Sequence, residues 1–322
     1  MNVAKYLMNN QAVIAYAANQ PQTVRLLVSG FVRALWLELT GTLNVTVLGT
    51  AVNRTPGTLV PTITTMLNGT EIYHSGRWND WVDRGYMFFK APAQTAATGG
   101  VASTAIASRI RLPFITPWAV RPSDTVLYLT NNDRLEVQVT WADENSQVTG
   151  GTKAWTTNPQ ITVIPEVTTE DGQPIAKYKE LALDSNALGV AANTDLNIPL
   201  TVGPKIAYHH LGLVAEDIPA AGRVPVTTLL NSVQLRQTSN GFTSQPFGPM
   251  TGSQIANEYD TYFNRAGVQT GIYPVVFQPR YDGRTNFNLD TSDLSDLRWI
   301  INHAGFTTDG RIRTLIGRVE RF

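Results

Sequence analysis

The sequence predicts an all-β protein in which a β-sandwich or barrel of ordinary domain size, about 150 residues, occurs twice along the chain. Three observations predict this fold. They are short runs of alternating apolar and polar residues, clusters of turn-forming residues between those runs, and an echo between two stretches in different halves of the chain. A chain of 322 residues is long enough for two such domains.

Alternating runs predict strands that are buried on one face. In residues 133–141 every second side chain from Leu135 to Trp141 is apolar, and the side chains between them are polar. Residues 42–50 and 109–114 repeat this pattern, which is typical of half-buried antiparallel strands. Turn chemistry separates the runs, with Gly, Pro, Asn and Asp clustered at residues 53–58, 67–70, 130–133, 148–152, 170–174 and 281–286.

The echo joins residues 60–73 to residues 224–236. Both stretches begin with Val-Pro, pass through a Thr pair and two large apolar residues to an Asn, and continue as an alternating run. Asn68 and Asn231 are 163 positions apart, and the same shift carries Phe114 onto Phe277. We therefore expect the strands after the two Asn residues to occupy equivalent places, and the two Phe side chains to point into equivalent cores.

Helical patterns are few. Residues 252–267 offer Ser253 as an N-cap, apolar side chains at helical spacing and a closing glycine. Residues 176–189 form a second candidate, placed between the two halves as a linker would be. Residues 1–20 form a third candidate, ended by Pro21, although Asn10 interrupts its apolar stripe.

Composition excludes several classes of protein. Lys and Arg balance Asp and Glu at 25 each, so no net charge draws the chain to nucleic acid or to an anionic membrane, and close packing of many copies meets little repulsion. The absence of cysteine excludes disulfides, thiolate metal sites and cysteine nucleophiles. Asn9 and Asn10 interrupt the first apolar run, so we expect a soluble chain with neither a signal peptide nor a membrane span.

Tandem β-domains of this size, joined by a linker, with a short helix in each and a helical N-terminal arm, resemble the double jelly-roll major capsid proteins of tailless icosahedral viruses. Many of these viruses have a membrane beneath the shell, and the length is most similar to the lipid-containing phage type that infects Flavobacterium. The resemblance covers the whole chain and rests on this architecture, on the echo, and on the character of residues 33–45. It implies an N-terminal arm at 1–20, eight-stranded jelly-roll barrels at 21–165 and 190–322, and a linker at 166–189.

The resemblance also implies a role and partners. Such a chain is a structural protein of the virion that forms pseudo-hexagonal homotrimers, contacts neighbouring capsomers, and meets penton or other minor capsid proteins. It would assemble in the host cytoplasm, and its N-terminal arm would reach an inner membrane. Lys5 is the only charged residue among the first 24, so we expect no direct contact with nucleic acid, which basic arms usually provide.

Metal sites are weakly indicated. The adjacent His209 and His210 should point to opposite faces of a strand and should not share an ion. Asp290, Asp293 and Asp296 could gather carboxylates around calcium, but they lack the EF-hand spacing, and a solvated turn is the competing interpretation. We expect no cofactor.

Aromatic residues form one further candidate site. They are Trp78, Trp81, Tyr86, Phe88 and Phe89. Such a group could be a platform for stacking a sugar or a base, or it could cover a barrel face or line a subunit contact. The first interpretation supports an alternative function, a carbohydrate-binding β-sandwich such as a phage receptor-binding or lectin-like protein.

No catalytic signature appears. The sequence contains no Gly-rich phosphate loop, no HExxH motif and no nucleophile elbow, so we predict a protein that is not an enzyme. Near the C-terminus, residues 310–322 carry four arginines, and their apolar spacing suits a helix whereas a jelly roll requires a last strand there.

Overall fold

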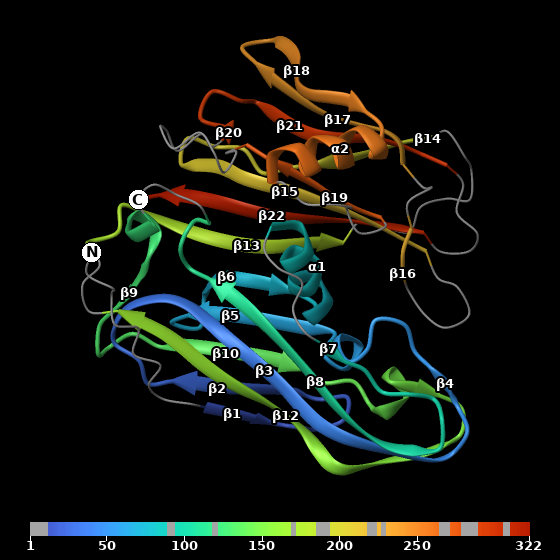
Figure 1. Ribbon diagram of the computed structural model, residues 1–322. Coiled ribbons are helices and arrows are strands. Elements are labelled where there is room, and N and C mark those ends of the chain that lie inside the picture. The colour runs from blue at the N-terminus through green and yellow to red at the C-terminus, as the bar shows by residue number, and fades with distance from the viewer. Residues whose placement is uncertain are drawn as a thin grey trace.

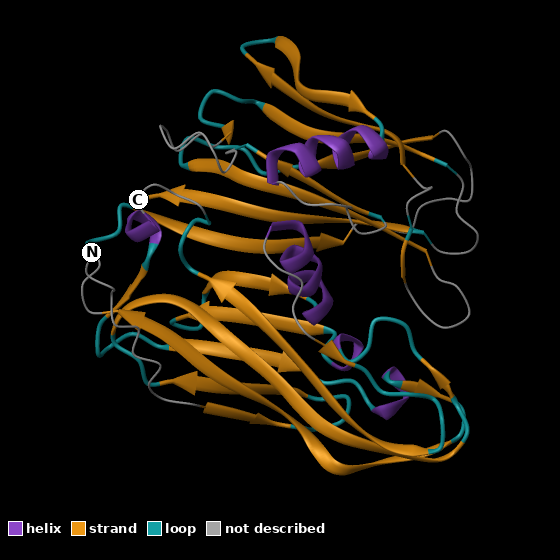
Figure 2. Cartoon of the chain, in the orientation of Figure 1, coloured by secondary structure: helices purple, strands orange, loops and turns teal. Residues whose placement is uncertain are grey.

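The computed structural model describes residues 12–88, 94–117, 122–168, 172–184, 194–217, 224–226, 230–263, 271–277, 289–304 and 310–322. Almost every regular element in them is a strand, as Figure 2 shows, and the predicted all-β class is confirmed. The elements fall into two groups along the chain. We call β1 to β12 the first sandwich and β13 to β22 the second sandwich.

The first sandwich contains one α-helix and three short 3-10 helices among its strands. Its elements are β1 (Ala12–Ala15), β2 (Pro21–Leu26), β3 (Gly30–Val47), β4 (Thr50–Ala51), η1 (Gly57–Leu59), β5 (Thr62–Leu67), β6 (Glu71–Gly76), α1 (Trp78–Phe88), β7 (Gln94–Thr95), β8 (Ala102–Pro113), η2 (Pro122–Thr125), β9 (Leu127–Leu129), β10 (Leu135–Thr140), η3 (Glu144–Ser146), β11 (Val148–Thr149) and β12 (Thr152–Thr168).

The second sandwich also contains one α-helix. Its elements are β13 (Ala176–Asp184), β14 (Thr194–Pro199), β15 (Ile206–Asp217), β16 (Val224–Pro225), β17 (Leu230–Ser239), β18 (Phe242–Met250), α2 (Gly252–Phe263), β19 (Ile272–Val276), β20 (Leu289–Asp290), β21 (Asp296–His303) and β22 (Arg311–Arg321).

Each sandwich packs a larger sheet against a smaller one. In the first sandwich the larger sheet has the order β1-β12-β3-β8-β7, and the strands β2-β10-β5-β6 lie opposite. Alternation along β3 explains the core, because Leu35, Leu37 and Leu39 are fully buried between the sheets while Trp36 and Glu38 face outward. The second sandwich has its own core around Leu211, Leu213 and Trp299 in the same arrangement.

The second sandwich repeats the topology of the first. Its larger sheet runs β13-β22-β15-β19, with the short strands β16 and β20 also paired with β15, and its smaller sheet runs β14-β21-β17-β18. The matching positions in the two sheets pair each element of the second sandwich with one of the first. In the larger sheets β13, β15, β19 and β22 correspond to β1, β3, β8 and β12. In the smaller sheets β14, β17, β18 and β21 correspond to β2, β5, β6 and β10, and helix α2 corresponds to α1. Even the short strands match, since β9 pairs with the start of β3 and β20 with the start of β15.

A shared β-bulge fixes the register of this repeat. The pairing of β3 with β12 skips Arg33, and the pairing of β15 with β22 skips His209, the fourth residue of its strand as Arg33 is of β3. The Phe114 backbone N–H donates to the Arg33 carbonyl at 2.8 Å, and the Phe277 N–H donates to the His209 carbonyl at 3.2 Å. The predicted equivalence of the two Phe residues is confirmed, and both pack in or against their cores.

The second predicted equivalence is wrong. Asn68 adopts a φ of 53° and, with Gly69, forms the turn between β5 and β6, whereas Asn231 lies inside strand β17. The counterpart of Asn68 and Gly69 is the turn of Asn240 and Gly241, where φ is again positive. Asn tolerates this left-handed conformation better than most residues, which explains why both hairpins use an Asn-Gly turn.

Strand β13 fuses the two sandwiches. It pairs antiparallel with β22 on one side and parallel with β6 on the other, through Glu180 opposite His74 and Leu181 opposite Ser75. The smaller sheet of the first sandwich therefore continues into the larger sheet of the second as one ten-stranded sheet. Figure 1 shows the strands of this sheet stacked through the middle of the molecule.

Several predicted elements need correction. Residues 176–184 form strand β13 instead of a helix, and residues 12–15, at the end of the predicted helical arm, form strand β1; residues 1–11 lie outside the described residues. The predicted helix at 252–267 is confirmed as α2, but its predicted N-cap is wrong: the helix begins at Gly252, and the Gln254 backbone N–H donates to Thr251 Oγ1 at 3.3 Å, so Thr251 caps the helix in place of Ser253. The C-terminal segment is strand β22, as a jelly roll requires.

Candidate functional site: the junction between the two sandwiches

Helix α1 stands where the two sandwiches meet (Figure 1). Trp78 and Trp81 face the first core, and the Trp78 indole Nε1 donates a hydrogen bond to Ser108 Oγ at 2.8 Å. Met87, near the end of the helix, packs with Val214 and Leu315 of the second sandwich. Helix α1 therefore packs against the core of the first sandwich and also against the second sandwich.

The polar face of α1 is paired with the second sandwich. Asp80 accepts from Arg313 of β22 with 2.6 Å between Oδ2 and Nη2, and both side chains are buried. Arg84 forms an ion pair with Glu180 of β13, and both of these side chains are also buried. These two pairs join residues that are far apart in the sequence, so they hold the sandwiches in one relative orientation.

Arg54 connects a third part of the junction. It forms an ion pair with Asp83 of α1, and its Nη1 lies 2.6 Å from Glu216 Oε1 of β15. Arg77 approaches the same Glu216 at 3.7 Å. Buried charges are tolerated when each has a partner, and here arginines and carboxylates balance. We call this set the junction network: Arg54, Arg77, Asp80, Asp83, Arg84, Glu180, Glu216 and Arg313.

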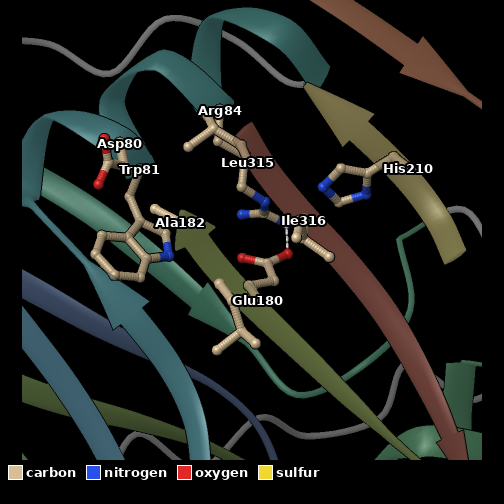
Figure 3. A pocket seen from close by; sticks show the side chains of 9 residues that line it. Asp80, Trp81, Arg84, Glu180, Ala182, His210, Leu315 and Ile316 are labelled. Carbon is tan, nitrogen blue, oxygen red and sulfur yellow. Dashed lines mark ion pairs between the residues drawn. The ribbon is translucent and has the colours of Figure 1, made fainter. Parts of the chain in front are cut away.

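Burial changes the ionisation of these carboxyls. It raises the pKa of Asp83 to about 7, although Arg54 beside it acts in the opposite direction. Burial likewise raises the pKa of Glu180 to about 7, opposed by Arg84 and by the Tyr178 hydroxyl, which donates to Glu180 Oε1 at 2.6 Å. The cavity that Figure 3 shows between Arg84, Glu180 and His210 has a volume of about 10 Å³. This space holds roughly one water molecule and no substrate.

The histidine pair is arranged differently from the prediction. The bulge at His209 breaks the alternation of β15, so His209 and His210 do not point to opposite faces, and their Nδ1 atoms lie 3.1 Å apart. Both rings are buried, and burial lowers the pKa of His209 to about 3 and that of His210 well below its usual value. Among the described residues no third His, Asp, Glu or Cys joins them to form a group that could hold a metal ion.

The predicted carboxylate site does not come together. Asp290 accepts from Arg321 at 2.9 Å and from the Ser292 backbone N–H at 3.0 Å, while Asp296 forms an ion pair with Arg298 at 2.6 Å. Asp293 is exposed. Each carboxylate thus has its own local surroundings, as the solvated-turn interpretation expects.

The predicted aromatic platform is mostly core. Trp78 is 0% exposed and Trp81 is 5% exposed, so neither indole can stack a ligand. Tyr86 is half-buried against the first core. The Phe88 side chain and all of Phe89 lie outside the described residues. These aromatics follow the rule that a helix on a sandwich buries its large apolar side chains.

One group of surface side chains was not predicted from the sequence. On the outer side of the larger sheet of the first sandwich, the Arg109 guanidinium carbon lies 4.2 Å from the centre of the Trp36 ring, and the Trp36 Nε1 donates to Glu166 Oε2 at 3.1 Å. Arg111 also pairs with Glu166, and Arg109 with Glu38. We call these five residues the Trp36 face. Its signal in the sequence is the set of Trp and Arg side chains on the non-core positions of strongly alternating strands.

No helix in the described part of the chain combines the length and the apolar character needed to cross a membrane.

Comparisons with known proteins identify the fold. No family model matches the chain, and no curated protein sequence matches it. The major capsid protein of STIV, Sulfolobus turreted icosahedral virus, superimposes with a TM-score of 0.74 and 11% identity over 99% of this chain and 96% of that one. The PBCV-1 virus capsid superimposes with a TM-score of 0.63 and 11% identity, over 99% of this chain and 97% of that one.

The major capsid protein P2 of bacteriophage PM2 superimposes with a TM-score of 0.62 and 10% identity, over 97% of this chain and 98% of that one. These are double jelly-roll proteins, so the predicted fold of two tandem jelly rolls is confirmed, and each sandwich is one jelly roll.

Proposed function

We propose that this chain is a structural virion protein, a major capsid protein that assembles as pseudo-hexagonal trimers into an icosahedral shell over an internal membrane. The observation that carries this proposal is the rigid fusion of two equivalent jelly rolls by β13 and the junction network. Solved structures that share the fold over nearly the whole chain are capsid proteins, which supports the same role.

The geometry suits tiling. Three chains supply six equivalent sandwiches, so a three-fold assembly can present an outline close to a hexagon. A capsomer of this kind needs a fixed angle between its sandwiches, and the buried ion pairs around α1 resist a change in that angle.

The proposal includes partners and location. The protein would contact neighbouring capsomers and penton or other minor capsid proteins, and it would act without enzymatic activity in the virion after assembly in the host cytoplasm. The N-terminal arm would meet the membrane. The domain boundaries proposed from the sequence place that arm at 1–20, of which residues 12–15 belong to the larger sheet of the first sandwich.

The alternative function, a carbohydrate-binding protein, loses its main support. It relied on loop aromatics such as Trp78 and Trp81, and both are buried.

Two measurements test the proposal. Light scattering on the purified chain should give a mass three times that of the 35.3 kDa monomer, and electron microscopy of native particles should reveal hexagonal capsomers. A monomer at every concentration and salt, together with particles that lack this protein, would overturn it. Saturable binding to glycans without particles would favour the carbohydrate-binding alternative.

A further inference from the structure

We propose that the contact between the two sandwiches of one chain is repeated between chains. The second sandwich of one copy docks on the Trp36 face of the next copy through α2 and through the edge of β18 that no described strand covers. This inference rests on the proposed function, because it names the surfaces through which capsid subunits of this kind would associate. The partner is a second copy of this chain.

The covered face of the second sandwich supplies the first argument. The outer side of its larger sheet presents Gly212, Val214, Ile272 and Leu315, and α1 of the first sandwich packs on it through Met87. The fit is close, since a Cβ on Gly212 would lie 2.6 Å from Met87 Sδ.

In the described part of the chain, the equivalent face of the first sandwich is partly exposed to solvent. The shared bulge places Trp36 at the position of Gly212 and Glu38 at that of Val214, and the strand registers place Arg109 at the position of Ile272. These are members of the Trp36 face, and the side chains of Arg109 and Glu38 remain 46% and 37% exposed. An aromatic ring held between arginines, with a polar rim, has the composition of a protein interface.

The two helices supply the second argument. Helices α1 and α2 both begin two residues after the preceding strand ends. The fourth residue of α1, Trp81, and the fourth residue of α2, Ile255, are both buried in the core of their own sandwich. This alignment matches the buried polar residues of α1 with exposed residues of α2. Asp80, Asp83 and Arg84 correspond to Gln254, Asn257 and Glu258.

The residues opposite the two helices change in the same way. Arg313 and Glu216, the two members of the junction network on β22 and β15, correspond to Thr162 and Thr40 on the first sandwich. The ion pair of Asp80 with Arg313 inside the chain thus corresponds to the uncharged Gln254 and Thr162 across the proposed contact. The two acids that share Arg54, Asp83 and Glu216, correspond to the uncharged Asn257 and Thr40, while Glu258 keeps a charge at the position of Arg84. Docking would therefore bury no unpaired charge at the four uncharged positions.

The sheet edges supply the third argument. In the first sandwich the edge strand β6 is covered by β13, the strand that corresponds to β1. In the second sandwich β18 corresponds to β6, and within the described residues it is the last strand of its sheet. An open edge readily adds another strand or sheet. Because β18 of one copy would meet the β1 side of the next, the contact is heterologous and generates a ring when the rotation closes.

Cross-linking tests the contact directly, since the chain contains no cysteine to interfere. A variant with Gln254→Cys and Thr162→Cys should form covalent dimers and trimers with a short bismaleimide linker, because these positions correspond to the ion-paired Asp80 and Arg313. The matched control carries Gln254→Cys and Thr23→Cys, with Thr23 exposed in the other sheet of the first sandwich. It should remain uncross-linked.

A charge reversal provides an independent readout. Arg109→Glu should raise the concentration at which oligomers dissociate by at least tenfold, as measured by light scattering, with an unchanged circular dichroism spectrum. Arg134→Glu, an equal change in an exposed loop at the end of the sandwich, should leave it unchanged. The inference would be overturned if the wild-type chain forms trimers, the Gln254→Cys, Thr162→Cys variant stays uncross-linked, and Arg109→Glu dissociates at the same concentration as Arg134→Glu. That result would leave the proposed function intact. A wild-type monomer would contradict both.

Discussion

Buried histidines make the stability of this protein sensitive to acid. His74 is fully buried, its Nε2 lies 2.9 Å from the Pro113 carbonyl, and its Nδ1 lies 2.6 Å from Thr65 Oγ1. A carbonyl can only accept, so Nε2 carries the proton and Nδ1 accepts from the Thr65 hydroxyl, which describes a neutral ring. Burial lowers the pKa of His74 to about 3.

The sign of the effect follows from this lowered pKa. An unfolded histidine takes up a proton as the pH falls below its ordinary pKa of 6.5, whereas the folded His74 does not until about 3. The stability that the neutral, buried His74 contributes is therefore fully present above pH 6.5 and is lost as the pH falls toward 3. Asp83 and Glu180 act in the opposite direction, because their raised pKa values add stability as the pH falls from 7 toward 4.

Replacing His74 isolates its share of this balance. We expect His74→Gln to reduce the acid-induced loss of unfolding free energy between pH 7 and pH 5 by about 2 kcal/mol relative to the wild type. Urea titrations at both pH values measure it. Thr65→Val is the control, since it removes the hydrogen bond and keeps the imidazole. An unchanged pH dependence in His74→Gln would contradict the neutral, buried state of the ring.

Gly317 of β22 is packed against the buried rings of the junction and has no room for a side chain. A Cβ there would lie 2.1 Å from His210 Cε1 and 2.6 Å from the Tyr178 hydroxyl, and both rings are buried. We expect Gly317→Ala to lower the unfolding free energy by about 1–3 kcal/mol, as overpacking does. Gly172→Ala should change it little, because no atom lies within 4 Å of the added carbon. Equal denaturation midpoints for the two variants would show that the junction can relax around the extra methyl group.

At the scale of elements, the sequence reveals strands better than it reveals their neighbours. The alternating run of β10 and the capped helix α2 depend on local patterns, and both were predictable. Strand β13 was not, because its Ala, Lys, Glu and Leu residues favour a helix and its pairing with β22 and β6 decides the outcome. The bulge at His209 likewise depends on tertiary pairing.

The junction network could not be predicted for the same reason. Asp80 and Arg313 are 233 positions apart, and Arg54 and Glu216 are 162 apart. Only the topology brings them together, and an isolated Asp or Arg in the sequence gives no sign of burial. The aromatic residues of α1 were recognised as a group, but whether they face the core or solvent depends on which side of the helix the sandwich covers.

The contact of α1 with β22 depends on a buried ion pair, and removing one partner should be more damaging than removing both. We expect Asp80→Ala to cost about 3–5 kcal/mol of unfolding free energy, because Arg313 loses its buried partner. The double variant Asp80→Leu with Arg313→Met should recover much of this loss. Glu38→Ala, at an exposed pair, should cost under about 1 kcal/mol. Additive effects of the two junction substitutions in a double-mutant cycle would contradict the pairing.

At the scale of the whole molecule, the duplication was predicted from two matches of which only one is structural. Phe114 and Phe277 occupy equivalent places because both follow a strand and hydrogen bond to the bulged residue of the neighbouring strand. The similarity of residues 60–73 to 224–236 is a coincidence of composition, since Asn68 is a turn residue and Asn231 is not. The repeat itself rests on the matching strand orders, which no short sequence match could establish.

Strand β1 decides how much of the N-terminus belongs to the first sandwich. It pairs with β12 from Ala12 to Ala15, and Ile14 is 2% exposed in the core. A deletion of residues 1–20 removes this edge strand. We expect the unfolding free energy to fall by about 2–5 kcal/mol, because the buried Ile14 side chain is lost from the core.

A deletion of residues 1–11 keeps β1 and separates folding from assembly. We expect it to leave the denaturation midpoint of the monomer close to that of the wild type while reducing the yield of particles, if the segment is an arm that contacts neighbours or a membrane. Denaturant titration and electron microscopy of the two truncated proteins measure the two effects. Particles that form normally without residues 1–11 would contradict the arm. A chain that folds equally well without residues 1–20 would mean that β12 can serve as the outer strand of the sheet, and that the edge proposed to meet β18 of the next copy is not β1.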